Sequence, residues 1–338
     1  MRKRHEKTIL VVSLAGLIIL CFASICMGRF SISYSELFTM ISGKIRGITF
    51  DTNAETILWQ VRIPRILAAV MIGSCLSLSG AAYQGVFRNP MVSPDILGAS
   101  AGAGFGAALG FLFGLPTMTV QLMAFATGMA AVFITWVLHR CMGTQGTSDK
   151  MMLILSGIVT GALFQALISI VKYVADPYDT MPSIAFWLMG GLTYVTDSDV
   201  KFLLIPALLG GIPLLLIRWR LNLLAFDTDE AEAMGMNVKR YRAVVMLCST
   251  MMTAACVAVG GMIGWVGLII PHFARMAVGP DYKKMLPCVV VFGGIFMLIV
   301  DDLARCLFAQ ELPIGILTAL VGAPVFAVLL MRGRRGFN

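Results

Sequence analysis

The sequence has 338 residues, of which 58% are hydrophobic and only 13% charged, about half of the charged share of soluble domains, which is roughly 25%. This composition excludes an ordinary soluble enzyme. The formal net charge is +8, and the positions of the basic residues give a reason for it that involves no nucleic acid.

Long runs without Asp, Glu, Lys or Arg recur along the chain, and a helix needs about 20 such residues to cross a bilayer. The first run follows Arg2, Lys3 and Arg4, but it is longer than the apolar region of a signal peptide, so we interpret it as a retained span. The first five predicted spans are Thr8–Gly28, Ile66–Phe87, two spans within Ile96–Leu138 separated near Gly114-Leu115-Pro116, and Met151–Val171.

The next apolar stretch, Thr180–Thr196, carries Pro182 and Gly190-Gly191 and is too interrupted to span a bilayer. It predicts a re-entrant or interfacial half-helix, whose backbone must be covered by protein. The remaining predicted spans are Phe202–Ile217, two spans within Ala243–Ala274 divided near Gly260-Gly261, Met285–Val300 and Leu312–Met331. The prediction is an all-α polytopic membrane protein with about ten transmembrane helices.

The distribution of Lys and Arg predicts the orientation. Ten spans place both termini on one side of the membrane. If that side is the cytoplasm, 18 of the 26 Lys and Arg residues lie inside and 8 outside, as the positive-inside rule requires. The basic net charge is then a consequence of topology. We expect a multi-pass protein of the plasma or inner membrane with both termini cytoplasmic and no nucleic-acid partner.

Small residues and cysteines indicate helix packing. Glycine occupies every fourth position from Gly98 to Gly114 in the third span, and small residues do the same from Ala69 to Gly85 in the second. Such stripes let helix backbones approach closely in lipid. The eight cysteines never form a C-x-x-C pair, which favours packing residues over disulfides or metal ligands.

The sequence lacks the motifs by which a transporter would use ATP or an ion gradient directly. It contains no G-x-x-x-x-G-K-[ST] motif, so it cannot bind ATP by a P-loop. No carboxylate lies inside a predicted span, because Asp301 and Asp302 follow the ninth at its outer end. This disfavours an ion-coupled secondary transporter and a membrane-embedded enzyme. We therefore expect no catalytic residue, no cofactor and no metal site, and an energy source on another subunit.

The longest predicted cytoplasmic connection, Arg218–Arg242, has a marked charge order. Acidic residues open it at Asp227, Gly235 stands where a helix would stop, and basic residues follow. This pattern is typical of a short, well-capped helix aligned with its dipole. Such a helix is either a solvated loop element or a docking element for a cytoplasmic partner.

Two arginines, Arg62 and Arg65, open the second span on the predicted outer side, with Pro64 in the first helical turn. Their placement opposes the positive-inside bias. They either anchor the helix to lipid headgroups or present guanidinium groups to carboxylates of a partner, and the residues alone leave these two interpretations even.

Four long motifs resemble the signatures of one family. They occur in the same order as in the FecCD-type permeases of ABC importers, which import iron-siderophores, haem and cobalamin. The motifs are Trp59–Arg65, Ser79–Gly98, Gly264–Arg275 and Glu311–Phe326.

The resemblance implies a single permease domain over residues 1–338 with the type II importer fold, in which spans 2 to 5 and 7 to 10 form inverted halves. It also implies a second permease copy, two cytoplasmic ATPase subunits that bind ATP and Mg²⁺, and an extracytoplasmic binding protein. The site residues that it implies are Arg62, Arg65 and Arg305 for binding-protein docking; Asp227, Glu230, Met234, Gly235 and Met236, in a coupling helix at about 226–238, for the ATPase; and Asn89, Met91, Thr144, Thr147 and Ser148 for a cytoplasmic gate.

The cargo is the least determined part of this interpretation. A ferric siderophore is the first candidate because it is the commonest cargo in the family, and haem, cobalamin and oxyanions are the alternatives. The 23 methionines do not indicate a copper or haem site, because methionine in apolar runs is commonly a flexible packing residue. An ion-coupled secondary transporter remains the remote alternative.

Overall fold

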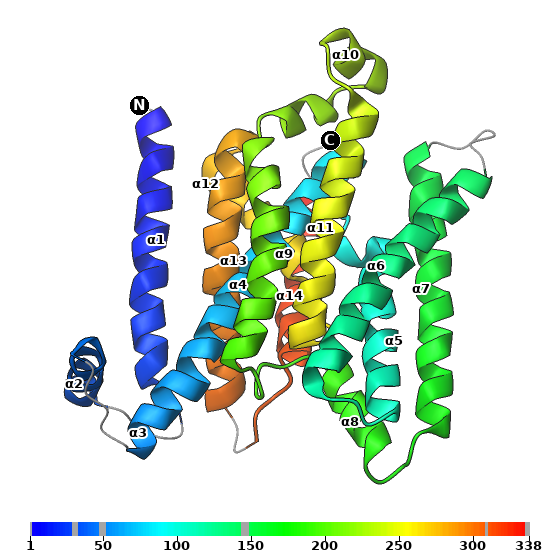
Figure 1. Ribbon diagram of the computed structural model, residues 1–338. Coiled ribbons are helices and arrows are strands. Elements are labelled where there is room, and N and C mark those ends of the chain that lie inside the picture. The colour runs from blue at the N-terminus through cyan, green and yellow to red at the C-terminus, as the bar shows by residue number, and fades with distance from the viewer. Residues whose placement is uncertain (1, 29–32, 47–51, 143–148, 308–309, 335–338) are drawn as a thin grey trace.

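The computed structural model describes residues 2–28, 33–46, 52–142, 149–307 and 310–334, and within these ranges all regular structure is helical (Figure 1). The elements in chain order are α1 (Arg2–Cys26), α2 (Tyr34–Ile45), α3 (Asn53–Thr56), η1 (Ile57–Arg62), α4 (Ile63–Phe87), η2 (Pro94–Leu97), α5 (Ala99–Leu112), α6 (Thr117–Met142), α7 (Asp149–Val174), α8 (Thr180–Leu188), α9 (Asp197–Leu216), η3 (Arg220–Ala225), α10 (Thr228–Ala233), α11 (Val238–Gly260), α12 (Val266–Val278), α13 (Tyr282–Cys306) and α14 (Ile314–Arg334). The predicted gate residues Thr144, Thr147 and Ser148 lie outside the described residues.

Each of the ten predicted spans corresponds to a helix of the structure. Seven helical stretches are long and apolar enough to cross a membrane, and three shorter apolar stretches, Ala99–Leu112, Val266–Val278 and Ile314–Leu329, complete the set. With 14 residues, α5 is about 21 Å long, less than the roughly 30 Å of a hydrocarbon core. The 3₁₀ turn η2 precedes α5, and the non-helical residues 261–265 precede α12.

The bundle has two distinct ends (Figure 1). At one end α1 begins, α14 ends and α10 projects beyond the other helices; we call it the α10 end. At the opposite end lie α2, α3 and α8; we call it the α8 end. The half-helix predicted within Thr180–Thr196 is present as α8, which has nine residues.

The two halves of the chain pack on each other reciprocally. The first long helix of the first half, α4, packs against α12 and α13 of the second half. Its counterpart in the second half, α11, packs against α5 and α6 of the first. This exchange of partners is what two inverted repeats would give.

The small-residue stripes lie in the tightest of these contacts. A Cβ at Gly106 would stand 2.5 Å from the carbonyl oxygen of Met123 on α6, and one at Gly73 would stand 2.1 Å from the carbonyl oxygen of Gly293 on α13. No side chain fits at such distances. Within α4 and α5 the stripes are therefore helix contacts, as predicted, whereas Gly114 lies beyond α5 and has nothing within 4 Å of its Cβ position.

Candidate functional sites at the two ends of the bundle

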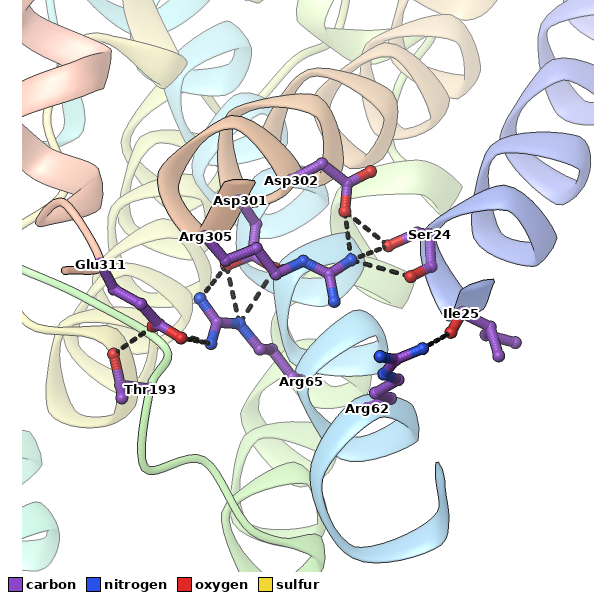
Figure 2. Close-up of polar contacts among 9 residues, drawn as sticks. All are labelled: Ser24, Ile25, Arg62, Arg65, Thr193, Asp301, Asp302, Arg305 and Glu311. Atoms are coloured by element: carbon purple, nitrogen blue, oxygen red, sulfur yellow. Dashed lines mark hydrogen bonds and ion pairs between the residues drawn. The ribbon is translucent and has the colours of Figure 1, made fainter. Parts of the chain in front are cut away.

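The α8 end contains a cluster of buried charges that joins elements far apart in the sequence (Figure 2). It contains three arginines and three carboxylates, and Arg65 and Arg305 form the ion pairs with these carboxylates. We call this cluster the outer ion network; its members are Ser24, Arg62, Arg65, Thr193, Asp301, Asp302, Arg305 and Glu311.

Arg65 lies at the centre of the outer ion network. Its Nε donates to both carboxylate oxygens of Asp301 at 3.0 and 3.1 Å, and its Nη1 donates to both oxygens of Glu311 at 3.1 and 2.9 Å. Glu311 also accepts a hydrogen bond from the Thr193 hydroxyl at 2.8 Å. The Arg65 guanidinium thus joins the start of α4 to the end of α13 and to the segment before α14. Glu311 in turn bonds to the connection between α8 and α9.

Arg305 ties the end of α13 to the end of α1. Its Nη2 donates to the carbonyl oxygen of Ser24 at 2.9 Å and forms an ion pair with Asp302. The Ser24 hydroxyl donates to the same carboxylate at 2.7 Å. The third arginine, Arg62, donates to the carbonyl oxygen of Ile25. The network therefore fixes α1 against the bundle.

The arginines predicted to dock the binding protein are buried in this structure, and their docking role stays a prediction. Arg62, Arg65 and Arg305 are only 4%, 5% and 6% exposed, because the chain supplies its own carboxylates and carbonyl oxygens. Buried charges persist only when paired and hydrogen-bonded in this way. The lipid-headgroup interpretation of Arg62 and Arg65 would require their side chains to reach the surface, and in this structure they are buried.

The carboxylate half of the outer ion network was missed from the sequence. The ninth span was expected to end at Val300, whereas α13 continues to Cys306 and carries Asp301 and Asp302 into the protein interior. A signal was present: Arg305 follows these two residues by four and three positions, the spacing of paired side chains on a helix. Nothing in the local sequence pairs Glu311 with Arg65.

At the α10 end, the predicted coupling helix is present but shorter than 226–238. The helix α10 has six residues, Thr228–Ala233. Asp227 and Glu230 form a reciprocal capping box at its start, which satisfies amide groups that the first turn leaves unbonded. Gly235 has a φ of +80°, and its left-handed backbone ends the helix as expected.

The side chains predicted to meet the ATPase divide into two groups. Asp227, Glu230, Met234 and Gly235 are exposed. Met236 is only 2% exposed and packs in the main hydrophobic core. It therefore anchors the segment to the bundle, and its predicted part in ATPase coupling would act through this packing rather than through direct contact with the ATPase.

The two predicted gate residues that the structure describes lie in the turn after α4. The Asn89 side-chain oxygen accepts a hydrogen bond from the backbone amide of Met91 at 2.9 Å. The Met91 side chain is exposed. The turn then enters η2, which packs against α7.

A cavity of about 310 Å³ lies where η2 and the start of α5 meet α7 and residues 262–264. Its polar lining side chains are Asp95, Ser100 and Gln165, and its lining includes no lysine or arginine. An anion would therefore find no cationic side chain there. In the described part of the chain, no group of three or more His, Cys, Asp or Glu residues could hold a metal ion.

Ten apolar helices in two reciprocally packed halves, with a capped helix projecting from one end, define the class of polytopic membrane permeases. The chain belongs to the FecCD transport family, which matches residues 16–332. It is therefore a permease of the type II ABC importer class, whose ATPase is a separate subunit.

Individual relatives cover nearly the whole chain. It is 41% identical to the molybdate import system permease protein MolB of Haemophilus influenzae, over 95% of this chain and 94% of the relative. It is 33% identical to the hemin transport system permease protein HmuU of Yersinia pestis, over 94% and 93%. It also resembles the structure of a metal-chelate type ABC transporter in an inward-facing conformation, with a TM-score of 0.87 and 38% identity, over 96% of this chain and 99% of that one.

Proposed function

We propose that this permease pairs with a second permease copy and is driven by two separate ATPase subunits that bind at the α10 end. ATP and Mg²⁺ belong to those subunits. An extracytoplasmic binding protein delivers the solute at the α8 end. The observation that carries the coupling part is α10 itself, a rigidly capped helix that stands beyond the bundle with Met234 on its exposed side.

The chemistry of α10 suits a protein cleft. Its capping box and the glycine that follows it hold the helix in shape without a partner. Met234 is a flexible apolar side chain of the kind enriched at protein interfaces. The buried Ala231 and Met236 attach the segment to the bundle, so a force on α10 reaches the membrane helices.

A methionine exchange tests this docking. Met234→Asp puts a charge on the exposed face of α10 and should abolish co-purification of the ATPase, while the membrane fold stays intact. Met27→Asp is the matched control, because Met27 is 45% exposed at the α8 end and Met234 is 49% exposed. ATPase binding that survives Met234→Asp would refute docking at α10.

All three arginines, Arg62, Arg65 and Arg305, are buried against groups of this chain. To dock there, carboxylates of the binding protein must replace these intramolecular partners. Glu311 is the most exposed carboxylate that pairs with Arg65, at 26% of its side chain. A carboxylate of the binding protein can therefore replace Glu311 most readily. Glu311→Gln should strengthen docking, and an unchanged affinity would argue against this exchange.

For the cargo, the relatives favour an oxyanion of the molybdate class over the iron-siderophore that was first expected. The support is the 41% identity to a molybdate permease along the whole chain; two iron chelatin permeases of Helicobacter pylori reach 35% and 34% over 84% of it. The membrane cavity offers no cationic side chain to an anion, so selectivity resides in the binding protein.

Transport into vesicles that contain the complete importer and its own binding protein decides the cargo. Labelled molybdate should accumulate with ATP, and excess tungstate should compete because it has the same charge and shape. A ferric siderophore should not compete. Uptake of the siderophore with no uptake of molybdate would restore the first expectation.

A further inference from the structure

The last helical turn of α4 ends at an arginine in an unfavourable backbone conformation. Arg88 has a φ of +52°, and Trp265 is the only other non-glycine residue with positive φ in the described ranges. Glycine adopts this left-handed conformation at lower cost and usually ends helices. An arginine here suggests that its side chain has a task, since strained positions persist where the surroundings hold them for a purpose.

The side chain of Arg88 reaches the segment that leads into α10. Its Nε donates to the carbonyl oxygen of Leu224 in η3 at 2.8 Å. Its Nη1 forms an ion pair with Asp227, the residue that caps the start of α10. One planar guanidinium therefore holds both ends of the 224–227 segment against the end of α4, which a lysine ammonium could not do with the same geometry.

The same segment is held on its other side by the second half of the chain. The Asn222 side-chain amide donates to the Asp281 carboxylate at 2.9 Å, and its oxygen accepts from the backbone amide of Tyr282 at 2.9 Å. Residues 220–227 are thus clamped between the end of α4 and the start of α13. By contrast, α10 itself packs mainly against η3 and α11.

Beyond Arg88 the chain continues through a turn into η2 and α5. The turn at Asn89–Val92 enters η2, where the carbonyl oxygen of Ile96 would stand 2.1 Å from a Cβ at Gly157 of α7. At this point the backbones of η2 and α7 are in direct contact. Both η2 and α7 also line the 310 Å³ cavity, through Asp95 and through Gly161 and Gln165.

We propose that Arg88 is the positioning residue that transmits the movement of α10 to the turn after α4, through its bonds to Leu224 and Asp227. This inference rests on the proposed docking of the ATPase at α10. It assigns to Arg88 no contact with the ATPase or with the solute. The role requires the geometry of the guanidinium as well as its positive charge.

The test measures solute transported per ATP hydrolysed in the reconstituted importer with its binding protein. Arg88→Gln should keep the ATPase bound but lower this ratio about tenfold, which is the order of an ordinary coupling between sites. Arg88→Lys should restore little of it. Arg140→Gln is the matched control, because Arg140 lies at the same end in the last turn of α6 and stacks on Trp136; its ratio should equal that of the wild type.

A double-mutant cycle isolates the Asp227 bond. Asp227→Asn keeps a residue that can cap α10 but removes the ion pair, so it should lower the ratio less than Arg88→Gln does. The double variant should be no worse than Arg88→Gln alone. Additive effects, or a wild-type ratio in both Arg88 variants, would overturn the inference.

The controls separate this inference from the docking proposal. If Arg88→Gln loses the ATPase or unfolds at a lower temperature, and Arg88→Lys transports normally, Arg88 has only a structural role and the inference fails. If Met234→Asp keeps the ATPase bound, the docking proposal fails whatever Arg88 does.

Discussion

Both ends of the permease use arginine–carboxylate pairs, but in opposite surroundings. At the α8 end Arg65 and Asp301 expose 6% and 0% of their side chains and share further partners. At the α10 end Arg88 and Asp227 expose 24% and 80%. Removing one partner of a buried pair costs about 3 to 5 kcal/mol because it leaves an uncompensated charge, whereas an exposed pair contributes roughly 0 to 1 kcal/mol.

This difference in burial implies that the pairs at the α8 end stabilise the fold, whereas the pair at the α10 end serves the proposed coupling to the ATPase. The outer ion network joins α1, α4, α13 and the segment before α14, so its loss weakens the assembly of the bundle. The ion pair of Arg88 with Asp227 adds little to the free energy of unfolding. Its proposed role is to hold the start of α10 against the end of α4. Similar chemistry therefore serves two purposes, and burial decides which.

The largest expected effect is at Asp301. Asp301→Asn leaves the outer ion network with one uncompensated positive charge and should lower the free energy of unfolding by about 3 to 5 kcal/mol. Denaturant unfolding of the purified permease in detergent measures it. Asp197→Asn, which removes an exposed pair with Lys201 at the α8 end, should change the midpoint little. Equal midpoints for the two variants would abolish the contrast between the ends.

An intermediate loss of stability is expected from overpacking a helix contact between the two ends. It tests whether mutations at the α8 end are destabilising because charges are buried there or merely because side chains are closely packed. Gly106→Ala would place a Cβ 2.1 Å from the Thr127 hydroxyl and 2.5 Å from a backbone oxygen. We expect a loss of about 1 to 3 kcal/mol. Gly16→Ala, where nothing lies within 4 Å, is the control and should stabilise α1 slightly. The same assay applies, and a loss at Gly16 as large as that at Gly106 would contradict the packing argument.

The smallest effect on stability is expected at the α10 end. Asp227→Asn should change the free energy of unfolding by less than about 1 kcal/mol, because the pair is exposed and asparagine can still cap α10. The difference from wild type should shrink further at high salt, since salt weakens the attraction between exposed charges and shortens the screening length from its roughly 8 Å at physiological ionic strength. Unfolding at two salt concentrations measures both; a large, salt-independent loss would show that this pair is structural like the outer one.

The spans were predictable because they depend on local composition. A charge-free run has to be a helix in lipid, where every backbone group must bond internally, so even the breaks at Gly114-Leu115-Pro116 and Gly260-Gly261 could be located. The stop at Gly235 was predictable for a similar reason, because only a local backbone conformation is involved.

The outer ion network was not predictable, because its partners are brought together only by packing. The sequence by itself determined that the chain is a ten-span helical membrane protein, which residues form its helices, and which motifs mark its family. Only the tertiary structure decided that Arg62, Arg65 and Arg305 are buried, that Met236 faces inward while Met234 faces outward, and that Arg88 holds the start of α10. Helix composition depends on near neighbours in the chain, whereas the pairing of Arg65 with Asp301 and Glu311 spans more than 230 residues and exists only once α4, α13 and the segment before α14 have packed together.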